Sequence, residues 1–416
     1  MKKLLVAAIA VALAVFMTIP ASAFENEFGG YFRVRAFNNT DFSGNSGYYT
    51  DSTGKVNLEG KQDVQKVDTR TRIYYTAKFS DNLKLVNKFE IDNEWGTGDM
   101  GDIGADGNGV LEIKNTYLDM NIGGFNVKLG AHGETIGRGF VFDDDFSGVT
   151  VSNEMGSFYW IKAVEGGVGN NANDGDKDAY AIAPTFKTSG ITINPYLVYV
   201  YQKSSDLKAY DLGVDIDADL KALAGIEGSA WFTGIYQGGD ENSDIDYSAY
   251  LAAVGAKAKV AGIDVHTQIF YASGDDDAND KDNNNFSDLI GGQSYYWAEI
   301  MGYGIFDDQV SNGSCADKIS DITAYNIGAS MSPVEKVTVG ADIWYATRNE
   351  AYSGDALGTE IDLSAKYQLM DNVNIDVVAA YLFADDGTTA AYNAAAPAKS
   401  KDEDPYELGV QLSLSF

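Results

Sequence analysis

The chain has 416 residues, with 61 acidic and 30 basic side chains and a net charge of −31. This charge argues against nucleic acid as a partner, because nucleic-acid binding requires a basic surface. The single cysteine, Cys315, excludes both a disulfide framework and a c-type haem site.

Residues 1–23 have the organisation of a secretory signal peptide. Two lysines precede a short apolar run, and an Ala-Ser-Ala stretch supplies the cleavage site. We therefore expect export and a mature domain over 24–416. No later stretch has the ~18 consecutive apolar residues that a membrane-spanning helix needs. A membrane protein with this sequence must therefore be a closed barrel.

The mature chain repeats one pattern, in which apolar and polar side chains alternate along segments of about ten residues. Alternation is typical of β-strands with one apolar and one polar face. The predicted strands number about eighteen, and a single-chain bacterial barrel requires an even number. In chain order they are 28–38, 67–79, 83–94, 111–122, 125–132, 146–152, 157–165, 179–187, 191–202, 209–220, 225–237, 247–260, 263–272, 321–331, 334–346, 359–369, 373–384 and 406–416.

Short and long connections alternate between these strands. The short turns are 80–82, 123–124, 153–156, 188–190, 221–224, 261–262, 332–333 and 370–372. The other connections are mostly longer and rich in Asp, Asn and Gly, as the outer loops of outer-membrane barrels are. The predicted fold is therefore all-β, a closed antiparallel transmembrane barrel. If 146–165 is instead a loop folded into the pore, the strands number about sixteen.

Charged residues occupy the predicted inward positions. The first three strands supply a basic wall of Arg33, Arg35, Arg70, Arg72, Lys84 and Lys88. Acidic residues are interleaved with them, so cross-strand ion pairing and a role in permeation both remain open. A later strand supplies an acidic face of Asp211, Asp215, Asp217 and Asp219. These carboxylates are expected to line water, because burying an unpaired carboxylate is costly.

The chain ends on an alternating strand whose last residue is aromatic. Its apolar face comprises Tyr406, Leu408, Val410, Leu412, Leu414 and Phe416. This stretch resembles the C-terminal strand of bacterial outer-membrane barrels, which ends in Phe and serves that family as an assembly signal. For this segment alone, the last strand of a soluble sheet is the alternative.

Four other stretches resemble the bacterial outer-membrane porin family, and are most similar to its OmpJ-like channels. They are F-G-G-Y-F-R-V-R at 28–35, V-D-T-R-T-R-I-Y-Y at 67–75, L-K-L-V-N-K-F-E at 83–90 and G-R-G-F-V-F-D-D-D-F-S-G-V at 137–149. The middle of the chain matches only in its rhythm. The resemblance implies passive diffusion of small hydrophilic solutes through a protein integral to the outer membrane of a Gram-negative bacterium. It also implies contact with lipid and lipopolysaccharide, assembly by the barrel-assembly machinery, and a homotrimer.

The resemblance further implies a constriction. In many porins the third outer loop bends into the pore, which makes Arg138, Asp143, Asp144 and Asp145 the candidate constriction residues. Opposed basic and acidic walls would create a transverse field, and the excess of acid would favour cations.

Other chemistry has weaker signals in the sequence. His132 and His266 are expected to be pore-wall imidazoles, without enzyme activity, because no local nucleophile and base accompany them. No cofactor is expected, although weak calcium candidates occur at Asp174, Asp176, Asp275 and Asp277. The alternatives to a channel are a surface protein acting as adhesin or as scaffold for an outer-membrane assembly, and an outer-membrane hydrolase.

Overall fold

The computed structural model is dominated by one antiparallel sheet that closes into a barrel. The described residues are 24–40, 48–50, 56–58, 64–97, 111–166, 175–242, 244–277, 280–295, 297–302, 304–306, 319–350, 356–385 and 404–416. The predicted signal peptide, Cys315 and Asp174 lie outside these ranges. Within them, no helix is both long and apolar enough to cross a membrane.

The barrel wall has 18 strands, which confirms the larger of the two predicted counts. β10 (Lys177–Pro184) and β11 (Phe186–Thr188) form one wall strand that is interrupted at Thr185. The other wall strands are β1 (Glu25–Thr40), β4 (Val64–Ser80), β5 (Leu83–Glu94), β6 (Leu111–Ile122), β7 (Phe125–Ile136), β8 (Phe142–Asn153), β9 (Gly156–Val164), β12 (Ile191–Gln202), β13 (Leu207–Asp219), β14 (Gly228–Glu241), β15 (Ile245–Val260), β16 (Ile263–Ala272), β18 (Ile322–Val334), β19 (Val337–Arg348), β20 (Ala356–Met370), β21 (Val373–Ala384) and β22 (Tyr406–Ser415).

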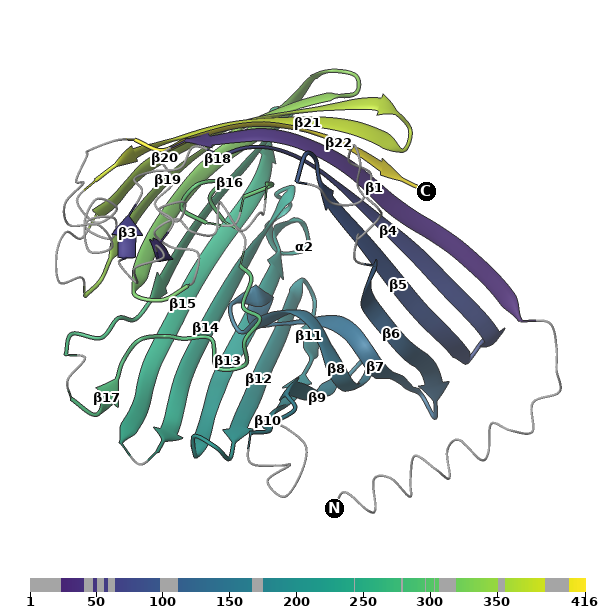
Figure 1. Cartoon of the computed structure of the whole chain (residues 1–416), viewed down its shortest axis with the longest axis vertical. Coiled ribbons are helices and arrows are strands. Elements are labelled where there is room, and N and C mark those ends of the chain that lie inside the picture. Colours follow the sequence, from purple (N-terminus) through teal and green to yellow (C-terminus); the bar gives the residue numbers. More distant parts are fainter. Residues whose placement is uncertain are drawn as a thin grey trace.

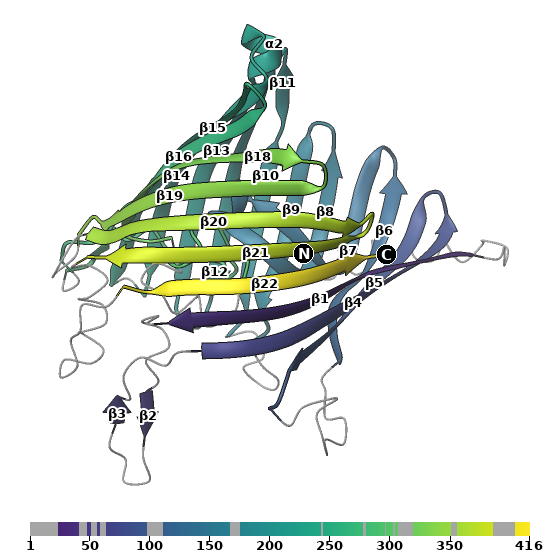
Figure 2. The same ribbon diagram turned by 90° about the horizontal axis from the view of Figure 1, so that it is seen from above.

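Short strands and one helix lie outside the wall, at the two ends of the barrel. β2 (Tyr48–Thr50) and β3 (Val56–Leu58) form a separate hairpin in the first long loop. β17 (Asp282–Asn283) pairs in parallel with β15 at the same, long-loop end. The helix α2 (Leu220–Ala224) replaces the predicted turn 221–224 and lies at the opposite, short-turn end (Figure 2).

The first strand pairs with the last, so the sheet has no free edge. β1 is antiparallel to β4 on one side and to β22 on the other, with Tyr31 opposite Ser415 and Thr40 opposite Tyr406. Figures 1 and 2 show the purple first strand beside the yellow last strand. Closure satisfies the backbone groups that an open edge would leave without partners in lipid.

Apolar side chains cover the outside of the wall, as the alternation predicted. Leu212, Ile327 and Leu363 are 55%, 64% and 53% exposed, because none of the described residues covers them. In the last strand, Leu408 and Val410 are exposed while Glu407 and Gly409 between them are buried inside. An apolar outer surface on a closed sheet is what a membrane-spanning barrel presents to lipid.

The predicted short turns are present, with two differences in detail. The turn predicted at 332–333 lies at 335–336, because β18 continues to Val334, and the helix α2 takes the place of the turn predicted at 221–224. β8 and β9 confirm the uncertain strand pair within 146–165. The alternative of sixteen strands is therefore wrong.

The C-terminal aromatic ring lies over Gly30 at the seam. The amide of Gly30 donates to the carbonyl of Phe416 at 2.8 Å, and the amide of Phe416 donates back at 3.1 Å. A Cβ on Gly30 would overlap the Phe416 ring and the carbonyl oxygen of Arg72. A Cβ on Gly29 would meet only the Phe416 carbonyl oxygen, at 3.1 Å.

We expect Gly30→Ala to destabilise the closed barrel, because overpacking at a tight contact costs about 1–3 kcal/mol. The measurement is the fraction of heat-modifiable, folded protein on gels across a urea series. Gly29→Ala is the matched control and should lose much less. Equal losses in the two variants would show that the ring does not need the space above Gly30.

Candidate functional site

The outer half of the β7–β8 hairpin leaves the wall and enters the lumen. β6 pairs with β7 only as far as Ala131, and β9 pairs with β8 only from Ser147. The tip between them pairs with itself alone, up to Ile136 opposite Phe142. Gly130, with φ 130°, supplies an unusual backbone conformation at the point of departure. We call residues 132–146 the hairpin tip (Figure 1).

The predicted constriction residues are therefore on a hairpin, not in a loop. Arg138 lies in a tight turn, Gly137–Gly139, which the flanking glycines permit with φ of 61° and 88°. Arg138 itself has φ 57°, a left-handed conformation that is rare for a residue with a side chain. Asp143 and Asp145 lie in strand β8. The third outer connection therefore enters the lumen as the resemblance implied, but as a hairpin, because β7 and β8 pair almost to their ends.

Arg138 fixes the tip to another section of the barrel wall. Its Nη2 donates to Oδ1 of Asp217 at 2.6 Å, and its Nε donates to Oγ1 of Thr233 at 3.1 Å. Its guanidinium lies over the Trp231 ring, 5.0 Å from the centroid. These partners belong to β13 and β14, so the tip crosses part of the lumen.

A second segment, described over 284–295, 297–302 and 304–306, also folds into the lumen, and sequence reasoning missed it. Ser287 receives a hydrogen bond from Gln237 of β14 and returns one. Further along, the amides of Ile300 and Met301 donate to the Glu360 carboxylate of β20 at 2.7 and 2.8 Å. The segment therefore crosses from β14 to β20. We call it the lumen segment.

The lumen segment and the hairpin tip pack on each other. Phe140 is fully buried and stacks on Tyr295, with ring centroids 3.8 Å apart. The side chain of Gln293 donates to the carbonyl of Phe140 at 2.6 Å, and Asp143 donates its amide to the carbonyl of Gly292 at 2.9 Å. An apolar cluster thus fills part of the barrel, against inward residues such as Val198.

One signal in the sequence points to this filling. Residues 196–201 read Y-L-V-Y-V-Y, apolar on both faces of the strand. A strand that is apolar on both faces is covered on both. Here lipid covers one face, and the inserted segments cover the inward side chains of Val198 and Val200, which are fully buried.

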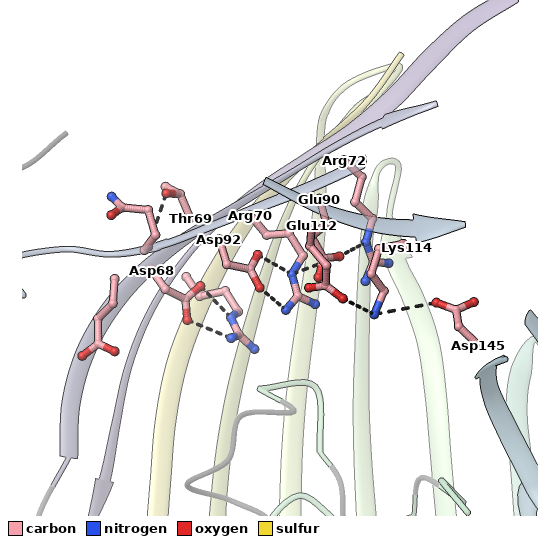
Figure 3. A network of polar contacts seen from close by, with 12 residues as sticks. Asp68, Thr69, Arg70, Arg72, Glu90, Asp92, Glu112, Lys114 and Asp145 are labelled. Atoms are coloured by element: carbon pink, nitrogen blue, oxygen red, sulfur yellow. Dashed lines mark hydrogen bonds and ion pairs between the residues drawn. The ribbon is translucent and has the colours of Figure 1, made fainter. Parts of the chain in front are cut away.

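The predicted basic wall is present, and its arginines are paired with acids. Arg35 binds Asp68 through two nitrogens, at 3.0 and 2.8 Å. Arg70 binds Asp92 at 2.7 and 2.6 Å, and Arg72 pairs with Glu90 (Figure 3).

Strand register accounts for these arginine pairs, since Arg70 lies opposite Asp92, and Arg72 lies opposite Glu90. Arg33 is buried beside them. Lys88 lies over the Tyr74 ring at 5.6 Å, and Lys84 lies opposite Lys78 and Asp119.

A cavity of about 630 Å³ separates this wall from the hairpin tip. Arg70, Arg72 and Lys114 line one side of it. The acids of the other side are Glu134, Asp143, Asp144 and Asp145. Lys114 reaches across, with its Nζ 3.7 Å from Oδ2 of Asp145, as Figure 3 shows.

The predicted acidic face on β13 is inward, but its carboxylates are not free in water. Asp211 is buried and accepts a hydrogen bond from Gln237 at 2.9 Å. Asp215 accepts one from Thr233 at 2.6 Å, and Asp217 binds Arg138. Asp219 caps α2, accepting from the amides of residues 221 and 222. Asp217 and Asp219 are exposed to solvent, as expected, but none of the four is unpaired, because β14, the hairpin tip and α2 supply partners.

The two histidines have different surroundings. His132 is buried in the hairpin, with Nε2 2.8 Å from the Thr150 hydroxyl and Nδ1 3.0 Å from the carbonyl of Gly130. His266 lies near the short-turn end of β16, and its Nε2 is 2.6 Å from Oδ1 of Asp342. The environment of His132 is that of a structural core residue.

Calcium ligands do not come together in the described parts of the chain. Asp176 pairs with Lys162 at 2.9 Å and accepts the amide of Gly166. Asp275 accepts the amide of Asp277 in a local turn. In those parts, no three His, Cys, Asp or Glu side chains are placed to hold a metal ion.

A second acidic group, around the lumen segment, was missed. It comprises Glu299 of that segment with Asp342, Glu360, Asp362 and Glu407 of the wall. Burial raises the pKa of Glu299 to about 7, although the amide of Ile305 donates to it at 2.7 Å. The wall acids occupy inward positions on correctly predicted strands. The alternation of these strands could therefore have shown that their carboxylates face the lumen.

Comparison with known proteins identifies the architecture through structure alone. No protein-family model matches the chain, and no curated protein matches it. OccAB2 from Acinetobacter baumannii superposes with a TM-score of 0.61 at 10% identity, over 94% of this chain and 98% of that one. The chain shares its fold.

Two structures from Pseudomonas aeruginosa are similar in the same way. OccD3 (OpdP) has a TM-score of 0.56 at 13% identity, over 96% of this chain and 93% of that one. The outer membrane protein OprD has a TM-score of 0.55 at 11% identity, over 94% of each chain. These matches support the closed barrel that the sequence predicted.

Arg138→Ala should release the hairpin tip, because the tip loses its contacts with β13 and β14. We expect chymotrypsin to cut at Phe140 or Phe142, which are buried in the intact protein. The readout is the cleavage rate and fragment mass of the folded barrel in detergent. Lys128→Ala is the control, because it removes the Lys128–Glu134 pair within the same hairpin. Equal resistance of Arg138→Ala and the wild type would contradict docking by Arg138.

Proposed function

We propose that this protein is an outer-membrane porin of a Gram-negative bacterium. It provides a water-filled channel through which small hydrophilic solutes and ions diffuse passively. The observation that carries the proposal is the charged cavity between the basic wall and the hairpin tip, inside a closed barrel with an apolar outer face. Likeness in fold to the outer membrane protein OprD supports the location.

The inserted segments restrict the passage to small solutes. The hairpin tip and the lumen segment pack against the side of the barrel that runs from β9 to β21. The open path therefore follows the opposite wall, past Arg70, Arg72 and Lys114. Solutes crossing it meet a guanidinium or ammonium group on one side and carboxylates on the other.

The passage has an excess of negative charge. Three of the wall's four arginines are neutralised by carboxylate partners. On the tip, Asp143 accepts from the neutral hydroxyl of Thr135 at 2.7 Å, and Asp145 accepts from the neutral amide of Asn115 at 2.6 Å, with the Lys114 Nζ 3.7 Å away. Lys114 also lies 3.6 Å from the Glu112 carboxylate, so it does not offset the charge of the three adjacent aspartates at 143–145. We therefore propose that the channel prefers cations.

Other aspects of the proposal rest on family resemblance. The four porin-like stretches support an OmpJ-like channel that is assembled by the barrel-assembly machinery and forms a homotrimer. Long loops on one side would face lipopolysaccharide. Enzymatic activity is not part of the proposal. Both ring nitrogens of His132 are hydrogen-bonded within the protein, and its ring packs on Phe146, so a substrate has no access to it.

Purified protein in planar bilayers should give reversal potentials on the cation side in a salt gradient. Neutralising Asp143, Asp144 and Asp145 to Asn together should move the reversal potential towards zero or to the anion side. The matched control neutralises Asp275, Asp276 and Asp277, which changes the net charge equally in a loop outside the cavity. Absence of conductance, or clear anion selectivity of the wild type, would refute the proposal. Equal shifts in both triple variants would refute the role of the tip.

A further inference from the structure

The sheet closes at β1 and β22, but the outer half of the wall is interrupted beside the hairpin tip. β6 pairs with β5 from Leu111 onwards and with β7 only from Thr116, so 111–115 have a strand partner on one side only among the described residues. β8 likewise joins β9 only from Ser147. Where the tip turns into the lumen, it therefore leaves an opening in the wall between β6 and β9 (Figure 1), which we call the window.

A cavity of about 390 Å³ occupies the window. Three consecutive residues of β6, 112–114, line this cavity, and so do three consecutive residues of β9, 161–163. Successive side chains of a strand point to opposite faces of the sheet, so a cavity that touches all three lies at an open edge of the strand. The window therefore reaches both faces of the wall.

The window extends from the lipid-facing surface to the charged cavity beside the hairpin tip. On the outside, Ile113 is 58% exposed and lines the window. On the inside, Lys114, Asp144 and Asp145 line both the window and the charged cavity, so the two spaces are adjacent. A molecule in the window can therefore contact lipid with one end and the charged cavity with the other.

The window lies close to the level at which the barrel meets the membrane interface. Trp160 precedes the window residues of β9, and strand register places Trp160, Tyr180 and Tyr199 side by side on the outer face. Rows of Trp and Tyr mark the interfaces of outer-membrane barrels. At this level, water and lipid head groups can pair with backbone groups at the open edges, which hydrocarbon cannot do. Molecules that collect at the interface are amphipathic.

The lining has an apolar part that suits the tail of such a molecule. Ile113 comes from one edge of the window, and Ile161 and Ala163 come from the other. Phe142 and Phe146 of the hairpin tip continue the apolar surface inward. A hydrocarbon chain that lies between the two edges would therefore stay in contact with apolar side chains.

The charged part of the lining has an excess of acid. It consists of three acids and two lysines, namely Glu112, Asp144, Asp145, Lys114 and Lys162. Lys162 is already paired at 2.9 Å with Asp176, which lies outside the lining. Lys114 lies 3.6 and 3.7 Å from two of the acids, which leaves Asp144 without an ion-pair partner among the described residues. A positive head group complements this lining, whereas an anionic head group is repelled.

We propose that the window is a lateral binding site for an amphipathic cation of the outer leaflet, of the long-chain alkylammonium class. Its ammonium group lies at Asp144, next to the charged cavity. Its chain passes between β6 and β9, over Ile113, into the lipid. This inference rests on the membrane location given in the proposed function, but it does not require conductance.

The test is photolabelling of the folded barrel in lipid vesicles. The probe is a dodecylammonium with a diazirine in its chain, and the parallel probe carries a sulfate head group on the same chain. Mass spectrometry locates the labelled peptides. We expect the cationic probe to label 111–115 and 161–164 in a saturable way. Unlabelled dodecylammonium should suppress this labelling, methylammonium should not, and the anionic probe should label these strands severalfold less.

Two pairs of variants separate the charge of the window from its space. Asp144→Asn should weaken labelling about fivefold, which corresponds to about 1 kcal/mol for one charge pair in water. Asp264→Asn removes a carboxylate of β16 that does not line the window, and should label like the wild type. Ser147→Trp fills the window from its lipid-facing side and should reduce labelling severalfold. Val149→Trp, on the same face of β8 but outside the lining, should not.

Heat-modifiable migration on gels confirms that each variant is folded. Equal labelling of the window strands by the cationic and anionic probes would overturn the proposal. Equal labelling of Ser147→Trp and Val149→Trp would also overturn it, because the probe would then lie elsewhere. A protein that inserts into vesicles without conducting would refute the channel and leave the window untouched, whereas a conducting protein without window labelling would refute the window alone.

Discussion

The pairing of β1 with β22 is the constraint on which the rest of the structure depends. A sheet in lipid cannot leave backbone groups unpaired at an edge, so its first and last strands must meet. Once they do, alternate side chains face lipid or lumen along every strand. Because Gly30 has no side chain, the Phe416 ring can lie over it while the two residues form reciprocal backbone hydrogen bonds. Closure of the sheet therefore creates the inner surface that the lumen-facing side chains form.

A ring of 18 strands encloses more space than wall side chains alone can fill. The hairpin tip and the lumen segment occupy part of that space, and they do so with apolar residues. Phe140, Tyr295 and Phe270 pack together inside the barrel, where a simple polar-inside rule would place water. The barrel is therefore a dry core on one side and a charged passage on the other.

Sequence reasoning predicted the architecture because the responsible interactions are local. Alternation along each strand and the alternation of short and long connections depend on neighbours in the chain, and both are readable without coordinates. The arginine pairs of the basic wall are also nearly local, since β4 and β5 are joined by a short turn. The inward position of the acids on β13 followed from the same parity.

The failures concern contacts between distant parts of the chain. Asp217 is far in sequence from Arg138, and Glu360 is far from the amides of Ile300 and Met301. Nothing in the alternation of β13 or β20 says which segment will enter the lumen to meet them. The run of apolar residues at 196–201 was a general sign of inward filling. It did not identify the filling segment.

Charged groups are arranged differently on the basic wall and on the hairpin tip, and this difference connects the structure to the proposed channel. On the basic wall, Arg35, Arg70 and Arg72 find carboxylates on adjacent strands, which offsets much of the wall's positive charge. On the facing hairpin tip, Asp143 accepts from a neutral hydroxyl, and Asp145 accepts from the Asn115 amide with the Lys114 ammonium 3.7 Å away. Charged groups of both signs therefore line the cavity between the wall and the tip, and their separation creates a field across it.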